Sequence, residues 1–139
     1  MKTIDEDIKT GQFKAVYLLY GEEAYLKKHY KDKLKNAMAD PEDTMNFAAY
    51  EGKNINPKEV IDLAETLPFF ADRRVILIEN SGFFKGSCED LAEYMKQIPE
   101  TTRFIFVEEE IDKRSKLYKA VKSAGKIVEF TTQTEELLT

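Results

Sequence analysis

The sequence has very little of the residue types that build disulfides, zinc sites and many catalytic centres. Its 139 residues include one cysteine, Cys88, and one histidine, His29. A single cysteine excludes an internal disulfide and a multi-cysteine zinc site, and it fits a reducing compartment. A single histidine cannot supply a pair of metal ligands, nor both a base and the group that orients it. The sequence therefore predicts no metal site and no catalytic residue.

Long apolar stretches and excess positive charge are also missing. No stretch approaches the roughly 20 apolar residues that span a bilayer, and no apolar run follows a basic start at the N-terminus, so we expect a cytoplasmic protein without membrane contact. The formal net charge is -5, which does not favour direct binding of nucleic acid by the surface as a whole. The length and the balance of 42% hydrophobic and 34% charged residues predict one soluble globular domain over residues 1–139.

Apolar runs of strand length alternate with helical patterns along the chain. We predict strands at 15–20, 45–50, 74–79, 103–107 and 126–130, with the first in the middle of the sheet. This alternation predicts an α/β fold with three layers: a mostly parallel five-stranded sheet and helices on both faces.

Four helices are predicted between these strands. The first carries Leu26, Tyr30, Leu34 and Met38 and ends near residue 40. The second begins at the cap Asn56 and runs to about residue 67, and the third follows a capping box at 87–90 and runs to about residue 98. The fourth is expected to begin at the cap Asp112 and to end at Gly125.

The loop after the first strand is where a parallel sheet would hold a nucleotide. A phosphate-binding loop needs clustered glycines, a lysine and a Ser or Thr, and we find none of these after Gly21. Glu22 and Glu23 would repel a phosphate at the start of the next helix. Glu79 is expected to be a surface carboxylate at a strand end rather than a magnesium ligand. The sequence therefore predicts no cofactor.

The remaining polar residues do not form a catalytic pattern. The lysines of the first and last helices (Lys27, Lys28, Lys31, Lys35, Lys116, Lys119 and Lys122) are expected to form solvated faces. His29 is expected on the surface, and Cys88 is expected to be an inert thiol. A phosphorylated receiver domain is a poor match, because Lys126 begins its strand rather than ending it.

Two adjacent aromatic residues, Phe69 and Phe70, follow Leu67 and Pro68 at the corner between a helix and a strand. Neighbouring side chains point in different directions, so one core can seldom bury both. The pair either binds a protein partner, as exposed aromatic residues often do, or packs under the edge of the sheet. Residues 83–84, also two phenylalanines, raise the same question more weakly.

Three stretches, residues 17–26, 67–78 and 112–119, resemble successive stretches of the delta subunit of bacterial DNA polymerase III. Their order and spacing match as well. The middle stretch is the most specific, because it joins the aromatic pair to a small residue, two arginines and a buried strand. The resemblance implies an N-terminal domain of the AAA+ type without a working nucleotide site, followed in the full-length protein by further helical domains.

The resemblance also implies a non-catalytic role in DNA replication. In this family a hydrophobic pair at a helix end inserts into the beta sliding clamp and helps open the ring, while other clamp-loader subunits hydrolyse ATP. By position, the clamp-binding residues here are Leu67, Phe69 and Phe70. The implied partners are the clamp, the delta prime and tau/gamma subunits and, through the assembled complex, primer-template DNA. The alternatives are a nucleotide hydrolase or transferase with a diverged phosphate loop, and a generic interaction domain.

Overall fold

The computed structural model describes residues 2–38, 46–66, 73–85 and 88–130. Its centre is a five-stranded sheet in the order β2-β3-β4-β1-β5, in which every pair of neighbouring strands is parallel. The strands are β1 (Val16–Tyr20), β2 (Phe47–Glu51), β3 (Arg74–Glu79), β4 (Thr102–Glu108) and β5 (Lys126–Glu129). The predicted α/β class, the five strands and the interior position of β1 are confirmed.

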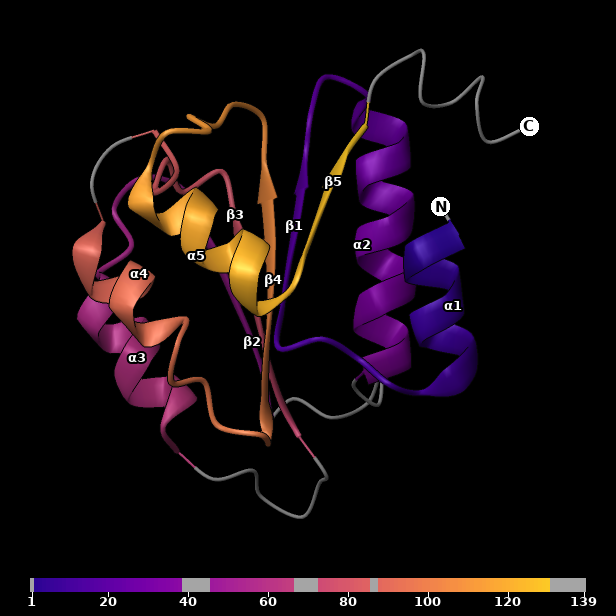
Figure 1. Cartoon of the computed structure of the whole chain (residues 1–139), viewed down its shortest axis with the longest axis horizontal. Helices are drawn as coiled ribbons and strands as arrows, with labels where there is room; N and C mark the ends of the chain where they lie inside the picture. The colour runs from indigo at the N-terminus through magenta and orange to yellow at the C-terminus, as the bar shows by residue number, and fades with distance from the viewer. Residues whose placement is uncertain (1, 39–45, 67–72, 86–87, 131–139) are drawn as a thin grey trace.

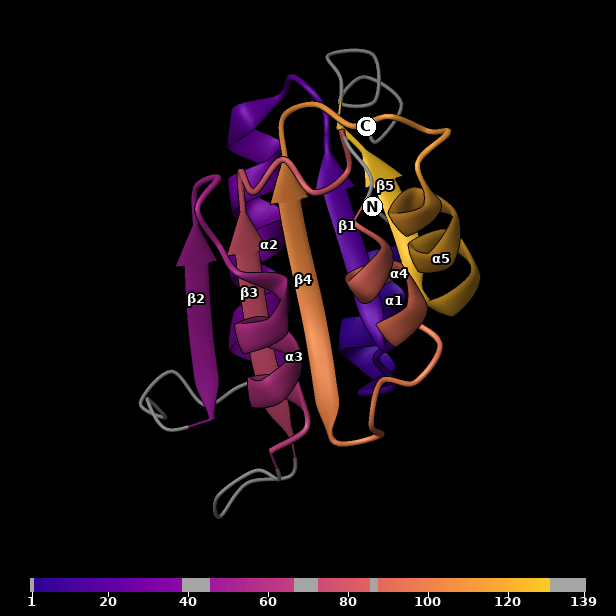
Figure 2. The ribbon, with the colours of Figure 1, turned by 90° about the vertical axis from the view of Figure 1, so that its left-hand side faces the viewer.

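Helices cover both faces of the sheet, which Figure 1 shows edge-on. One face carries α1 (Lys2–Thr10) and α2 (Ala24–Met38). The other carries α3 (Pro57–Ala64), α4 (Glu89–Tyr94) and α5 (Lys116–Ala124), which lie in front of the sheet in Figure 2. Because all strands run the same way, the sheet has an amino edge, where the strands begin, and a carboxyl edge, where they end.

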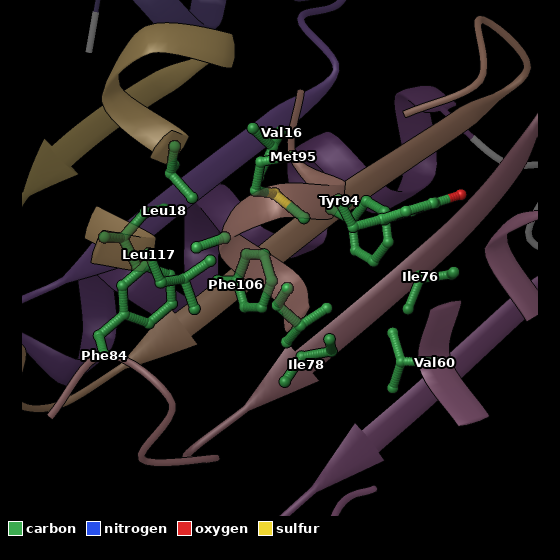
Figure 3. Close-up of a cluster of buried hydrophobic side chains, with 14 of the residues drawn as sticks. Val16, Leu18, Val60, Ile76, Ile78, Phe84, Tyr94, Met95, Phe106 and Leu117 are labelled. Atoms are coloured by element: carbon green, nitrogen blue, oxygen red, sulfur yellow. The ribbon is translucent and has the colours of Figure 1, made fainter. Parts of the chain in front are cut away.

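A hydrophobic core lies on each face of the sheet. Under α3, α4 and α5, side chains such as Phe84, Phe106 and Leu117 fill one cluster, shown in Figure 3. Under α1 and α2, the second cluster contains Leu34 of α2 and buried residues of β1, β3 and β4 such as Tyr17. Strands buried on both faces explain why β1, β3 and β4 read as continuous apolar runs.

Helix α1 is a feature that the sequence analysis did not predict. Ile4 is fully buried in the core under α2. The Asp7 carboxylate accepts a hydrogen bond of 2.6 Å from the Tyr17 hydroxyl and lies 2.9 Å from Nζ of Lys126. One buried carboxylate thereby joins α1 to β1 and β5.

Several helix boundaries differ from the prediction. α3 ends at Ala64 and α4 at Tyr94, each a few residues early. α5 begins after Ser115, whose hydroxyl accepts from the Tyr118 amide at 3.1 Å, so Asp112 is not its cap. Asp112 instead accepts from the Arg114 amide and closes the preceding turn. Both residue types cap helices, and only the turn geometry separates them.

Glycine is required where β5 meets the rest of the sheet. A Cβ at Gly125 would lie 1.8 Å from the carbonyl oxygen of Val16, and one at Gly21 would lie 2.3 Å from that of Phe130. Gly21 also has a φ of +121°, a backbone angle that residues with a side chain rarely adopt. These two close approaches hold β5 against β1 at both edges of the sheet.

Candidate functional site

The residues predicted to bind a partner, Leu67, Phe69 and Phe70, lie outside the described residues. The structure does describe both ends of the segment that carries them. Thr66 precedes the segment at the end of α3, and Arg73 follows it immediately before β3. The amino edge of the sheet is therefore where this candidate site is attached.

Hydrogen bonds hold the two ends of that segment in place. Nε of the buried Arg74 donates to the carbonyl oxygen of Thr66 at 3.1 Å. The hydroxyl of Thr102, at the start of β4, donates to the carbonyl oxygen of Ala64 at 2.7 Å. Two strands thereby fix the end of α3, so that residues 67–72 must begin and end at defined points.

The second aromatic pair belongs to the core. Phe84 is fully buried and packs edge-on against Phe106, with ring centroids 5.1 Å apart. Phe83 is half-buried against the same cluster. These rings are not a second partner-binding site.

At the carboxyl edge, Lys27 corrects the sequence analysis twice. It stands six residues after Gly21, which is the spacing of the lysine in a phosphate-binding loop, although Leu26 replaces the preceding glycine and Lys28 the following Ser or Thr. It is also only 6% exposed rather than part of a solvated face. Burial lowers the pKa of Lys27, while Glu109 and Glu108 counteract that shift.

The neighbour of Lys27 is Glu108, a buried carboxylate that is 1% exposed at the end of β4. Nζ of Lys27 lies 3.4 Å from the Glu108 carbonyl oxygen. The Glu108 carboxylate accepts hydrogen bonds from the Ser81 amide (3.1 Å), the Ser81 hydroxyl (3.0 Å) and the Gly82 amide (2.9 Å). Burial raises the pKa of Glu108, and these donors and Lys27 oppose the rise. Backbone amides and a lysine that resemble a phosphate cradle thus serve a carboxylate of the chain itself.

A second lysine of α2 is used in a similar way. Nζ of Lys31 lies 3.3 Å from Oε1 of Glu79, the residue that ends β3. Glu79 is half-buried and paired, and not simply a surface carboxylate. Lys35 lies 4.9 Å from the centre of the Phe47 ring. Lys27, Lys31 and Lys35 therefore make specific internal contacts. Lys28 on α2, and Lys119 and Lys122 on α5, are exposed as expected.

The hollow beside these pairs is acidic. It has a volume of about 400 Å³, and its lining includes Glu108, Glu109 and Glu110 together with Lys53 and Lys85. Nζ of Lys85 is paired with Glu110 at 2.7 Å. Three carboxylates against two lysines disfavour a triphosphate at this edge.

The only histidine and the only cysteine stand as the sequence analysis predicted. His29 is exposed, with its ring parallel to that of Tyr25. Burial raises the pKa of the Cys88 thiol, which makes it less reactive. In the part of the chain that the structure describes, no group of three His, Cys, Asp or Glu side chains is arranged to hold a metal ion. Nor is any helix in the described ranges both long and apolar enough to cross a membrane.

A parallel sheet in this order, with a diverged loop after β1, defines an AAA+-like α/β domain. The fold matches a DNA polymerase III gamma subunit-related protein of Thermotoga maritima with a TM-score of 0.66, at 12% identity, over 97% of this chain and 48% of that one. The chain belongs to the DNA polymerase III delta subunit family, whose model matches residues 17–131.

Two relatives from Bacillus subtilis support this assignment. The DNA polymerase III subunit delta is 27% identical over 136 residues, which cover 89% of this chain and 39% of that protein. The structure of the DNA clamp loader delta protein matches with a TM-score of 0.81 and 26% identity, over 92% of this chain and 41% of that one. The chain thus spans about two fifths of the length of these relatives.

Proposed function

We propose that residues 1–139 form the N-terminal clamp-binding domain of a clamp-loader delta subunit. Leu67, Phe69 and Phe70 insert into a hydrophobic pocket of the beta sliding clamp. The observation that carries this proposal is the fixed frame of their segment, in which Arg74 bonds to Thr66 across its two ends. A short apolar segment with fixed ends loses less conformational entropy on binding, which raises its affinity.

The domain acts mechanically and is not itself an enzyme. Lys27 and Lys31, two lysines near the strand ends, contact Glu108 and Glu79 of the chain itself. ATP hydrolysis then belongs to other subunits of the loader, the tau/gamma subunits, which assemble with this subunit and delta prime. Further helical domains after residue 139 make these contacts, and primer-template DNA is bound by the complex as a whole.

Ring opening follows from differential affinity. A protein shifts the clamp toward an open ring only if it binds the open form more tightly than the closed one. The side chains of Leu67, Phe69 and Phe70, which we call the hydrophobic wedge, supply this difference in affinity when the pocket of the clamp changes shape between the two forms. This domain favours the open ring, and the ATP-driven subunits control when it can reach the clamp.

The test is calorimetry of this chain with the sliding clamp of the same organism. The double variant Phe69→Ala, Phe70→Ala is expected to bind at least about 30-fold more weakly, because buried aromatic anchors dominate such interfaces. Tyr25→Ala is the matched control, since Tyr25 is an aromatic residue that is 74% exposed on α2. A natural chain that folds but does not bind the clamp, or a double variant that binds equally well, would contradict the proposal.

A further inference from the structure

Two arginines lie together at the amino edge beside an aromatic ring: Arg73, immediately before β3, and Arg103 in β4. The guanidinium carbon of Arg73 is 5.0 Å from the centre of the Phe13 ring, and its Nη1 donates to the carbonyl oxygen of Met38 at 3.2 Å. Arg103, the second residue of β4, donates from Nη1 to the carbonyl oxygens of Thr102 and Glu100. We call Phe13, Arg73 and Arg103 the arginine cluster.

The arginine cluster has no carboxylate ion-pair partner in the part of the chain that the structure describes. Within residues 2–38, 46–66, 73–85 and 88–130, neither Arg73 nor Arg103 forms an ion pair with a carboxylate. Nε of Arg103 is buried and has no hydrogen-bond acceptor there. Burial lowers the pKa of Arg103 and the charge of Arg73 lowers it further, while Tyr17 and Glu100 counteract the shift. In a chain of net charge -5, two neighbouring guanidinium groups without a carboxylate ion pair among the described residues are a local exception.

The position of the cluster ties it to the proposed clamp-binding segment. Arg73 is the first described residue after 67–72, and the next residue, Arg74, holds the far end of that segment through Thr66. A protein bound to residues 67–70 therefore lies within a few residues of Arg73. The backbone contacts of both arginines and the ring of Phe13 restrict their side chains before a partner arrives.

We propose that the arginine cluster is a second contact region, which binds carboxylates on the same protein partner that residues 67–70 hold. This inference rests on the proposed function. Guanidinium groups pair with carboxylates through two parallel hydrogen bonds, and an arginine held by an aromatic ring is already oriented for such a pair. The hydrophobic wedge supplies affinity, while the cluster sets the orientation of the partner and speeds encounter.

Guanidinium groups also bind the phosphates of nucleic acid. Continuity with the apolar segment favours a protein surface, because Leu67, Phe69 and Phe70 offer nothing to a phosphate backbone. The experiment distinguishes a protein carboxylate from a nucleic-acid phosphate, since a sliding clamp and a primer-template duplex can be titrated separately.

The experiment is calorimetry of residues 1–139 with the sliding clamp at several salt concentrations. Affinity of the natural chain is expected to fall as salt rises, because salt screens exposed charges. The double variant Arg73→Gln, Arg103→Gln is expected to bind about 10-fold more weakly at low salt and to show a flatter salt dependence. The matched control Lys119→Gln, Lys122→Gln removes the same charge from exposed positions of α5 and is expected to match the natural chain.

The outcomes separate this inference from the proposed function. If the natural chain does not bind the clamp, both fail. If it binds through Phe69 and Phe70 while the arginine variant keeps the natural affinity and salt dependence, only the arginine cluster is refuted. Loss of duplex binding with unchanged clamp binding would make the cluster a nucleic-acid site and would also refute the inference.

Folding of the variant is controlled separately. Circular dichroism and the melting temperature show whether Arg73→Gln, Arg103→Gln folds. If it does not, the charge-retaining variant Arg73→Lys, Arg103→Lys replaces it, and we expect weaker binding with the natural salt dependence. The salt dependence of the natural chain needs no variant, and an affinity independent of salt would by itself overturn the inference.

Discussion

Positively charged residues at the two edges of the sheet differ in whether they pair with a carboxylate. At the carboxyl edge, Nζ of Lys27 contacts the main-chain carbonyl oxygen of Glu108 at the end of β4, and Nζ of Lys31 pairs with the Glu79 carboxylate at the end of β3. At the amino edge, Arg73 and Arg103 have no such carboxylate among the described residues. Open parallel sheets usually bind ligands at the carboxyl edge. In this domain the chain's own contacts fill that edge, and the proposed partner-binding groups lie at the opposite edge.

Under the proposed function, this fold exchanges nucleotide binding for protein binding. A phosphate site needs backbone amides and a lysine that are free for the ligand. Here the amides of residues 81 and 82 and the lysine at position 27 are already used by the main chain and carboxylate of Glu108. These amides follow β3, whereas the loop after β1 lacks the clustered glycines of a phosphate site.

The largest stability effect in this comparison is expected from Glu108→Gln. An amide can accept from one of the donors at residues 81 and 82, but its own NH₂ group then faces the other donors. Loss of hydrogen bonds to a buried charge is expected to lower the free energy of unfolding by about 2 kcal/mol, measured by urea denaturation. Glu109→Gln, at the neighbouring exposed position, should change it by less than about 0.5 kcal/mol. Equal stability of the natural chain and Glu108→Gln would show that the carboxylate does not close this edge.

A smaller effect on stability is expected at high pH from two tyrosines, one near each end of β1. Burial and the hydrogen bond to Asp7 raise the pKa of Tyr17, near the amino edge. Burial, and then Glu129 and Tyr118, raise the pKa of Tyr20, near the carboxyl edge, to about 12 from an ordinary 10.0. Because the folded pKa exceeds the unfolded one, the stabilisation is complete below pH 10 and is lost as the pH rises through the folded value.

Tyr17→Phe and Tyr20→Phe test this at both ends. Each variant should lose stability more gradually than the natural chain above pH 10, as measured by urea denaturation at a series of pH values. Tyr17→Phe should also cost about 1 kcal/mol at neutral pH, since its hydroxyl donates to Asp7 at 2.6 Å. An unchanged pH dependence in both variants would mean that these phenols titrate normally.

The sequence predicts the frame of the domain better than its charged contacts. Strands such as 74–79 are continuous apolar runs, and their burial on both faces follows directly. Helix α1 was missed because Ile4 and Ile8 are its only apolar residues, and its burial depends on Ile4 and Asp7 meeting distant partners. The role of Glu108 could not be predicted, because its donors lie 26 and 27 positions away in the sequence.

Lys27 is different, because a signal for its burial was present. It stands three residues before Tyr30 and seven before Leu34, so it shares the face of α2 that points into the core. A lysine on the apolar stripe of a helix indicates a buried partner for its charge. The clamp-binding assignment of residues 67–70 has a different basis, since it comes from the family resemblance and stays a prediction.

The smallest effect is expected at the second pair of the carboxyl edge. Lys31 and Glu79 are 3.3 Å apart, with side chains that are 16% and 24% exposed. Partly solvated pairs gain little, because water and salt screen them and two long side chains must be ordered. Lys31→Met should therefore lower the free energy of unfolding by about 0.5 kcal/mol or less, and Lys28→Met on the exposed face of α2 is the control. A loss of more than about 2 kcal/mol would show that the Lys31–Glu79 pair also contributes strongly at the carboxyl edge, whereas a small loss would leave Glu108 and its donors as the main contribution.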